Sequence, residues 1–452
     1  GTTRLSVTNI GVVDPDYTLD VSGEINGLNL GVEVLFSQTF DLSDLNRRNS
    51  VTFGDSITWT YSYDPLGNLE TANKFDISEP VNDKAFSYTY DEIGNRLTAT
   101  EDGVTKNYTP NNLNQYDDID GTTILYDEDG NPTTKDDWDL TWDFENRLVS
   151  MVDTVQDIVI DFTYDYRGFR ATKKVTENGI VTKHIGYVYN GKLVAAEINL
   201  MEDQQTGDPK QDVIRSYTWG LDPAGTRQEV GGIGALVGME TFNYDEVTGD
   251  FVDTDKYHVV SDASGNVTQL LLSNADGSVS IANTYEYGPF GQVINKTETV
   301  DMPYQFNTKY TDEETGLVYY GYRFYDAEHG RWLNQDPIGV NGGINLYNSV
   351  SNNMVNGFAG ELSFSGGMYN EVGEFGVSYG VDAFGEEEYD LVPIGQNELA
   401  IHAYNGDYNL CYCGTIRINF RTNQVTQDDR KKCLSSTGDI LFSQIKRFAI
   451  AG

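Results

Sequence analysis

The sequence predicts an all-β protein, and three observations support this fold class. Helical periodicity is nearly absent between residues 55 and 325. The chain holds 46 Gly and 30 Tyr in 452 residues, a composition that favours turns and half-buried strands. A short turn motif also recurs between runs of β-favouring residues, which is the pattern of successive hairpins.

The recurring motif places Tyr or Trp, then Asp, two variable residues, Gly and often Asn, between two β-favouring runs. Its Asp can accept hydrogen bonds from backbone N–H groups, and its Gly supplies a positive φ, as in a type I turn with a bulge. A variant, "WDFENRL", has Asn146 where Gly would stand. Each copy predicts a strand, a tight turn and a strand. The structural turns are expected at Asp64 and Gly67, Asp91 and Gly94, Asp127 and Gly130, Asp165 and Gly168, and Asp262 and Gly265.

A ligand loop is the alternative interpretation of this motif. A nucleotide-binding switch would need an upstream phosphate loop with Gly-Lys-Ser or Gly-Lys-Thr, and the sequence has none. An EF-hand loop would need a terminal Glu, which "YDEDGNPTTKDDW" lacks. We therefore expect no cofactor and no dedicated metal site, and scattered calcium binding at the turns stays the open alternative.

Charge and hydrophobicity argue against two classes of partner. The chain carries 70 acidic and 30 basic residues, a net charge of −40, whereas nucleic acid and anionic lipid both require a basic face. We expect no membrane span, because no run of about 18 apolar residues occurs. The opening "GTTRLSVTNI" has no leader-like regions, so we expect that a signal was removed or that the chain is a piece of a longer one.

The repeated turns resemble the YD repeats of the RHS/YD-repeat family. The run "PYQFNTKYTDEETGLVYYGYRFYDAEHGRWLNQDPIGVNGGINLYNSVSNNMVN", residues 303–356, is similar to the RHS-associated core of that family. The resemblance covers about residues 56–356. It divides the chain into leading β-strands (1–55), a YD-repeat shell (56–300), the core (301–360) and a variable C-terminal region (361–452).

The resemblance implies that the strands wind as a spiralling sheet into a hollow shell or tube, with the core region plugging or lining one end. Family members hold a C-terminal segment inside, often a toxin. Curling leaves few sheet edges to aggregate, and we expect Tyr and Thr on the inner face to keep the cavity hydrated. The repeat region is short for a closed shell, so an open shell, a missing upstream segment and stacking into fibres stay open.

The core of family members ends in two Asp residues that cleave the chain in the manner of an aspartic protease. Asp336 in "QDPIG" matches the first, whereas Ala359 stands at the second position and Met354 replaces the usual Pro. Such chemistry needs two close carboxylates that share a proton. We therefore expect that self-cleavage is lost and that the protein is not an enzyme. Asp336 is then a vestigial autoprotease residue or a structural Asp-Pro turn.

All three Cys residues lie in the C-terminal region, at Cys411, Cys413 and Cys433. One must stay unpaired within the chain. A Cys413–Cys433 disulfide, a Cys411–Cys433 disulfide and three free thiols are the alternatives, and zinc bound with His402 is a weaker one. After Asp390, seven Lys and Arg minus five Asp and Glu give +2, which suits either a cargo in an acidic shell or a small β appendage.

We therefore predict a non-enzymatic structural shell, secreted or on a bacterial cell surface, that encloses or carries its C-terminal region as in polymorphic toxin systems. The alternative is a secreted, filament-forming or adhesive surface protein without toxin activity, in which shells self-associate into fibres. The density of the core motif favours the shell with cargo. The replaced Asp, the short shell and the few candidate catalytic residues of the C-terminal region favour the filament.

Overall fold

The predicted all-β fold class is confirmed. The computed structural model describes residues 18–20, 37–43, 47–53, 57–76, 79–202, 210–222, 231–245, 249–357, 388–395, 398–405, 411–419 and 424–428. The chain forms two compact units, Gly1–Leu42 with Arg48–Ser365 and Ser43–Arg47 with Gly366–Gly452. Across the described residues, no helix is long and apolar enough to cross a membrane.

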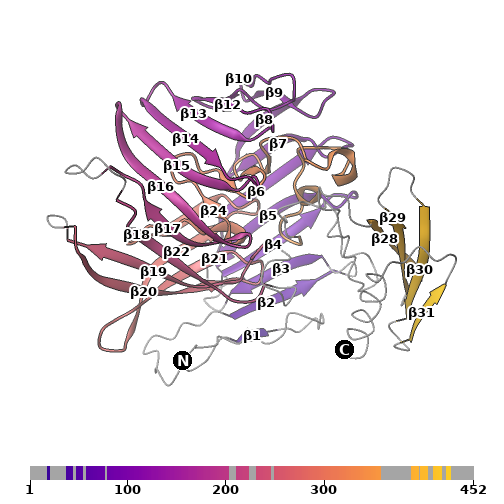
Figure 1. The fold of residues 1–452 in the computed structure, drawn as a ribbon. Coiled ribbons are helices and arrows are strands. Elements are labelled where there is room, and N and C mark those ends of the chain that lie inside the picture. Colours follow the sequence, from indigo (N-terminus) through magenta and orange to yellow (C-terminus); the bar gives the residue numbers. More distant parts are fainter. Residues whose placement is uncertain are drawn as a thin grey trace. The chain divides into compact units, whose positions relative to one another are not determined.

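Two antiparallel sheets make up most of the first unit, and within each sheet every strand pairs with its neighbours in sequence (Figure 1). This order follows from short hairpin turns, which need no crossover. The first sheet contains β1 (Thr18–Asp20), β2 (Ser37–Leu42), β3 (Arg48–Phe53), β4 (Ile57–Tyr63), β5 (Leu69–Asp76), β6 (Glu79–Tyr90), β7 (Arg96–Glu101), β8 (Val104–Pro110), β9 (Tyr116–Ile119) and β10 (Thr122–Thr123).

The second sheet continues the same meander. It contains β11 (Thr134–Lys135), β12 (Trp138–Trp142), β13 (Leu148–Asp153), β14 (Ile158–Tyr164), β15 (Arg170–Glu177), β16 (Ile180–Asn190), β17 (Leu193–Asn199), β18 (Val213–Trp219), β19 (Leu236–Tyr244), β20 (Phe251–Ser261), β21 (Val267–Ser273), β22 (Val279–Tyr287) and β23 (Val293–Thr297). The second unit is described as one antiparallel sheet of β28 (Glu388–Gly395), β29 (Glu398–Asn405), β30 (Cys411–Asn419) and β31 (Gln424–Asp428).

In most of the repeated hairpins, a bulge marks the aromatic residue that precedes the Asp. The register of β6 and β7 shifts between Thr89 and Tyr90. The hydroxyl of Tyr90 donates to the carbonyl oxygen of Leu69, just after the preceding turn, at 3.0 Å. Successive hairpins are therefore linked through the aromatic residue of the motif. The same bond to a preceding hairpin is made by Tyr63, Trp142, Tyr164, Tyr189, Trp219, Tyr244 and Tyr287.

The two faces of the sheets differ in polarity. The expectation that Tyr and Thr side chains line a hydrated inner face is wrong. Tyr217 is buried and packs edge-on against Tyr304, with ring centroids 4.9 Å apart. Several cross-strand Thr pairs instead lie on the exposed face, where Thr89 Oγ1 is 2.7 Å from Thr98 Oγ1. The physical reason is that an aromatic ring gains more free energy from burial than a Thr side chain does.

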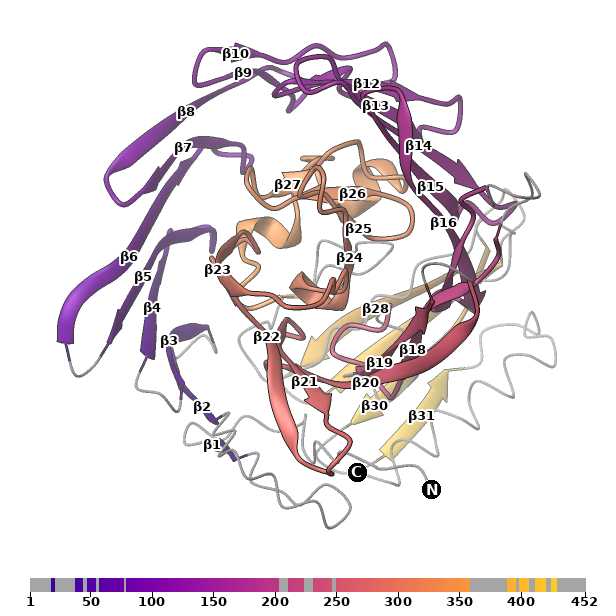
Figure 2. The ribbon, with the colours of Figure 1, turned by 90° about the vertical axis from the view of Figure 1, so that its left-hand side faces the viewer.

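Residues 301–357, here called the core segment, lie between the two curved sheets (orange in Figure 2). The segment forms β24 (Tyr310–Thr311), β25 (Val318–Tyr319), β26 (Phe324–Asp326) and β27 (Arg331–Trp332), and the 3-10 helices η1 (Phe306–Thr308), η2 (Gly339–Gly342) and η3 (Val350–Asn352). Its apolar side chains complete both hydrophobic cores. Leu317 belongs to the cluster that contains Ile160 of β14, and Trp332 belongs to the cluster that contains Leu69 of β5.

The repeat at Asp127 departs from the predicted strand, turn and strand. Its flanks make only an isolated bridge between Tyr126 and Pro132, because Pro has no N–H to donate to a ladder. The first sheet ends at β10 and the second begins at β11. We call the connection between them, residues 124–133, the seam.

Candidate functional site

The Asp-containing turns contact the core segment through their backbone and amide groups. Asn352 joins two of them, because its Nδ2 donates to Oδ1 of Asn68 at 3.1 Å and to the carbonyl oxygen of Gly94 at 2.8 Å. Further contacts of this kind join Asn345 to Asn95, Tyr347 to Gly130, Asn353 to Gly67 and Asn356 to Tyr63. The core segment therefore holds the hairpins by their turns.

Each Asp of the five predicted turns is engaged inside its own turn. Oδ1 of Asp91 accepts from the backbone N of Ile93 at 3.0 Å and of Asn95 at 2.8 Å. The same pair of donors, two and four residues on, serves Asp64, Asp127, Asp165 and Asp262. The partner glycines all have positive φ: Gly67 92°, Gly94 82°, Gly130 83°, Gly168 84° and Gly265 75°.

Asp336 lies in a tight turn of the core segment and faces a buried cation. Its Oδ2 is 3.1 Å from Nη1 of Arg323, and its Oδ1 accepts from the backbone N of Ile338 at 3.1 Å. The guanidinium lies 3.9 Å from the ring centroid of Trp332. Burial lowers the pKa of Arg323 to about 10, against the opposing effect of Asp336. A carboxylate placed this way acts as a structural counter-ion.

The structure describes only some of the residues that were singled out from the sequence. Ala359 and Cys433 lie outside the described residues. Cys411 and Cys413 belong to β30, where Cys411 pairs with Asn405; His402 belongs to β29. The disulfide alternatives therefore stay predictions. Met354, at the position of the usual Pro, is buried in the core segment.

A buried ion-pair cluster joins the second sheet to the core segment. Nη1 of Arg170 is 2.7 Å from Oδ2 of Asp312, and Nζ of Lys173 is 2.8 Å from Oδ1. Burial opposes ionisation of Asp312, but the charges of Arg170 and Lys173 outweigh it and hold the pKa of this carboxyl below its usual value. Four aromatic rings surround the guanidinium of Arg170, those of Phe162, Tyr187, Tyr310 and Tyr319.

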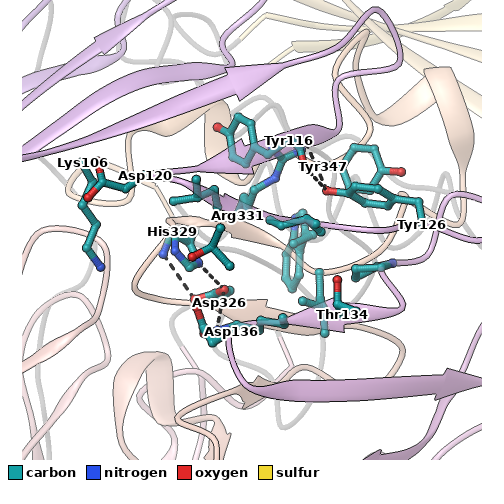
Figure 3. A pocket seen from close by; sticks show the side chains of 17 residues that line it. Lys106, Tyr116, Asp120, Tyr126, Thr134, Asp136, Asp326, His329, Arg331 and Tyr347 are labelled. Atoms are coloured by element: carbon teal, nitrogen blue, oxygen red, sulfur yellow. Dashed lines mark hydrogen bonds and ion pairs between the residues drawn. The ribbon is translucent and has the colours of Figure 1, made fainter.

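A cavity of about 220 Å³ lies beside the seam, and residues of the first sheet, the second sheet and the core segment line it (Figure 3). Tyr126 and Tyr347 lie toward one end, whereas Lys106 and Asp120 lie toward the other. Its apolar and aromatic lining includes Tyr116, Ile119, Ile124, Pro132, Trp332 and Leu333. The cavity thus combines an aromatic part with an ionic part, which is a common composition of small-molecule sites.

Asp326 is the centre of the ionic part. Its Oδ2 is 2.6 Å from Nδ1 of His329 and 3.3 Å from Nζ of Lys135. Burial opposes ionisation of Asp326, but His329 and Lys135 outweigh it and hold the pKa of this carboxyl far below its usual value. Burial also disfavours the charged form of Lys135, but the carboxylates of Asp326 and Asp136 outweigh this effect and raise the pKa of Lys135. The carboxylate of Asp326 and the ammonium group of Lys135 are therefore both charged at neutral pH.

The sequence analysis did not single out Asp326, His329 or Arg331, although "YDAEHGRW" contains all three. The available signal was its Tyr-Asp pair. Tyr325 donates to the carbonyl oxygen of Phe290 at 2.8 Å, and Asp326 accepts from the backbone N of Glu328, as in the repeated turns. Among the residues that the structure describes, no group of three or more His, Cys, Asp or Glu is arranged to hold a metal ion.

Comparison with known proteins shows what this chain is similar to. The Teneurin YD-shell family model matches residues 240–356. Double-stranded DNA deaminase toxin A of Burkholderia cenocepacia (strain H111) is 27% identical over 320 residues, which cover 65% of this chain and 20% of that protein. Toxin subunit YenC1 of Yersinia entomophaga is 38% identical over 85 residues, which cover 18% of this chain and 9% of that protein. The chain thus spans a small part of the length of these relatives.

The solved structures agree on the fold. The structure titled "Crystal Structure of TcdB2-TccC3-Cdc42" superposes with a TM-score of 0.57 at 19% identity, over 73% of this chain and 17% of that chain. Antiparallel hairpins with repeated Tyr-Asp turns, held by a core segment, define a protein of the YD-shell class. These findings confirm the resemblance to RHS/YD-repeat proteins that the sequence motifs predicted.

Proposed function

We propose that this chain is a structural RHS-type shell that carries its own C-terminal unit, residues 366–452. One observation carries the proposal: the core segment is bonded to successive turns of the first sheet and buried against both sheets. The C-terminal unit follows this segment in the chain. A cargo attached there is joined to a part of the shell that many contacts hold in place.

The chemistry of the cargo is a second step of the proposal. Two relatives have names that include the word toxin, one of them a double-stranded DNA deaminase toxin. We infer that the C-terminal unit acts as a toxin-type cargo of a secreted or cell-surface bacterial shell. The shell itself is non-enzymatic in this proposal, since Asp336 pairs with Arg323 and the turn carboxylates bond their own backbone.

A cut-and-retain experiment tests whether the shell carries its C-terminal unit. A recognition sequence for a site-specific protease is inserted after Ser365, and the cut protein is passed over a size-exclusion column. Carriage predicts that both pieces elute together at the position of the uncut protein. Separate elution of a folded shell and a free C-terminal piece contradicts carriage.

One edge of the second sheet argues against the filament alternative. The last strand of the second sheet, β23, is short and exposes Lys296. A short edge strand that carries Lys discourages pairing with another sheet. Electron microscopy of the native chain distinguishes the two functions, because single particles favour the shell and regular fibres favour the filament.

A further inference from the structure

Three neighbouring turns of the first sheet expose an apolar residue at the same position. Leu66, Ile93 and Leu113 are each the third residue of a turn. The backbone N of each donates to the side chain of the first turn residue, at 2.9, 3.0 and 2.9 Å respectively. Leu66 is 68% exposed, Ile93 43% and Leu113 67%. Turns of one geometry at the same end of a sheet present equivalent side chains on the same side, so the three residues form a row.

The core segment adds two exposed apolar residues beside this row. Ile344 is 77% exposed and Val340 is 76% exposed. The carbonyl oxygen of Ile344 accepts from Nδ2 of Asn114 at 3.3 Å, in the turn that carries Leu113. The backbone N of Gly343 donates to the carbonyl oxygen of Val340 at 3.2 Å, which keeps Val340 close to Ile344. We call these residues the turn patch: Leu66, Ile93, Leu113, Val340 and Ile344.

The turn patch is poor in charge, although the protein is strongly acidic. The stretches 111–115 and 339–347, which supply three of the patch residues, contain no charged residue. In the other two turns, Asp64 and Asp91 bond their own backbone, and Glu92 is the only further charge. Two copies of a chain with net charge −40 repel each other over most of their surface, whereas an uncharged apolar patch lets them approach.

The exposed area of the turn patch is large enough for a dimer interface. A Leu, Ile or Val residue exposed to this degree presents on the order of 100 Å² of apolar surface. The whole patch therefore presents about 500 Å². Homodimer interfaces are about 65% apolar, so this area corresponds to about 800 Å² from each copy, which is the size of a standard stable interface.

We propose that two copies of this chain associate through the turn patch into a dimer with twofold symmetry. In such an interface the same patch faces itself, so that an apolar surface meets an apolar surface and few like charges are brought together. A twofold interface is closed and stops at two copies, unlike the head-to-tail contact that a fibre requires. This proposal does not depend on any cargo.

Sedimentation equilibrium of the full chain tests the proposal. Interfaces of this size give dissociation constants in the micromolar range or below, so protein concentrations from about 1 to about 100 μM should reveal the mass of a dimer. Added sodium chloride should strengthen the association, because it screens the repulsion between two chains of net charge −40. An association that salt weakens would be held by ion pairs and would overturn the proposal.

A substitution in the turn patch should weaken the dimer. L113D should raise the dissociation constant about tenfold or more, because it places two like charges in a twofold interface. The variant should fold, since Asp129 occupies the equivalent position of the turn at Asp127. The matched control is V104D: Val104 is 73% exposed and begins β8 at the end away from Leu113. This control should leave the dissociation constant unchanged.

A second variant covers the case in which L113D fails to fold. Leu66 holds the equivalent position two turns earlier, so L66D should weaken the dimer as well. A natural chain that stays monomeric over the whole concentration range, with and without added salt, would overturn the proposal. Equal effects of the patch variants and of V104D would overturn it too, because they would place the contact outside the turn patch.

Discussion

Arg170 and Asp312 form an ion pair at 2.7 Å with both side chains 1% exposed, and the pair joins β15 to the core segment. A buried charge that loses its partner destabilises a fold by about 3–5 kcal/mol. D312N should therefore lower the free energy of unfolding by about that amount in urea titrations. The control E240Q breaks a largely exposed pair with Lys256 and should change it by less than about 1 kcal/mol. Equal effects of the two variants would contradict the structural role of the pair.

Acid should destabilise the protein in a defined pH range. The pKa values of Asp312 and Asp326 are lowered in the folded state by neighbouring cations, although burial opposes this. A lowered pKa stabilises the fold above the unfolded value of about 3.9, and this stabilisation is lost as the pH falls below it. Unfolding free energy should therefore drop steeply below about pH 4, and less steeply in D312N. An identical acid dependence of the two proteins would argue against this assignment.

Two glycines with nearly the same φ should differ in their tolerance of Ala. A Cβ at Gly94 would lie 2.8 Å from Nδ2 of Asn348 and 3.0 Å from that of Asn352, whereas a Cβ at Gly103 would meet nothing within 4 Å. Their φ values are 82° and 86°, so the conformational cost of about 1–2 kcal/mol is shared. G94A should cost about 1–2 kcal/mol more than G103A in thermal unfolding, because it displaces the core segment. Equal costs of G94A and G103A would show that the close approach of the core segment to Gly94 does not contribute to stability.

The carboxylate of Asp91 should matter to its own hairpin alone. D91A removes bonds to Ile93, to the backbone of Asn95 and to its side chain, which should cost about 1–2 kcal/mol. Hydrogen exchange should speed up in β6 and β7 and stay unchanged in β20 and β21. The neighbouring E92A, at an exposed position, is the control without effect. Loss of a bound ion in D91A would favour a ligand loop instead.

The chain should remain uncut near residue 360. The proposed reason is that Ala359 replaces a catalytic Asp and Asp336 pairs with Arg323. The intact mass of purified protein, measured before and after prolonged incubation, should be that of the full chain. Fragments with a break near Gly360 that disappear in D336N would show that self-cleavage persists.

The hairpins were predictable because their causes are local. The Asp at the start of a turn bonds backbone within four residues, and Gly at positive φ is a property of one residue, so "YDEIGNRL" predicts a turn without knowledge of the rest. The same reasoning did not predict the interruption at Asp127, where Pro132 prevents strand pairing. It also assigned the Tyr side chains to a hydrated face, because alternation indicates two faces but not which one is buried.

The cavity beside the seam was not predictable, because its parts lie far apart in the sequence. Lys135 belongs to β11, whereas Asp326 and Arg331 belong to a hairpin about two hundred residues later. Nothing in either stretch indicates the other, and only the wrapping of the sheets around the core segment brings them together.

The sequence by itself determined the all-β class, the repeated turns, the family resemblance and the replaced Asp, since each rests on neighbouring residues or on a contiguous motif. The tertiary structure alone decided that Asn352 bonds two turns, that Asp336 has Arg323 as its partner and that Arg331 lies between two tyrosines in a cavity. These contacts depend on the burial of the core segment by both sheets, and burial is a property of the packed chain rather than of any stretch within it.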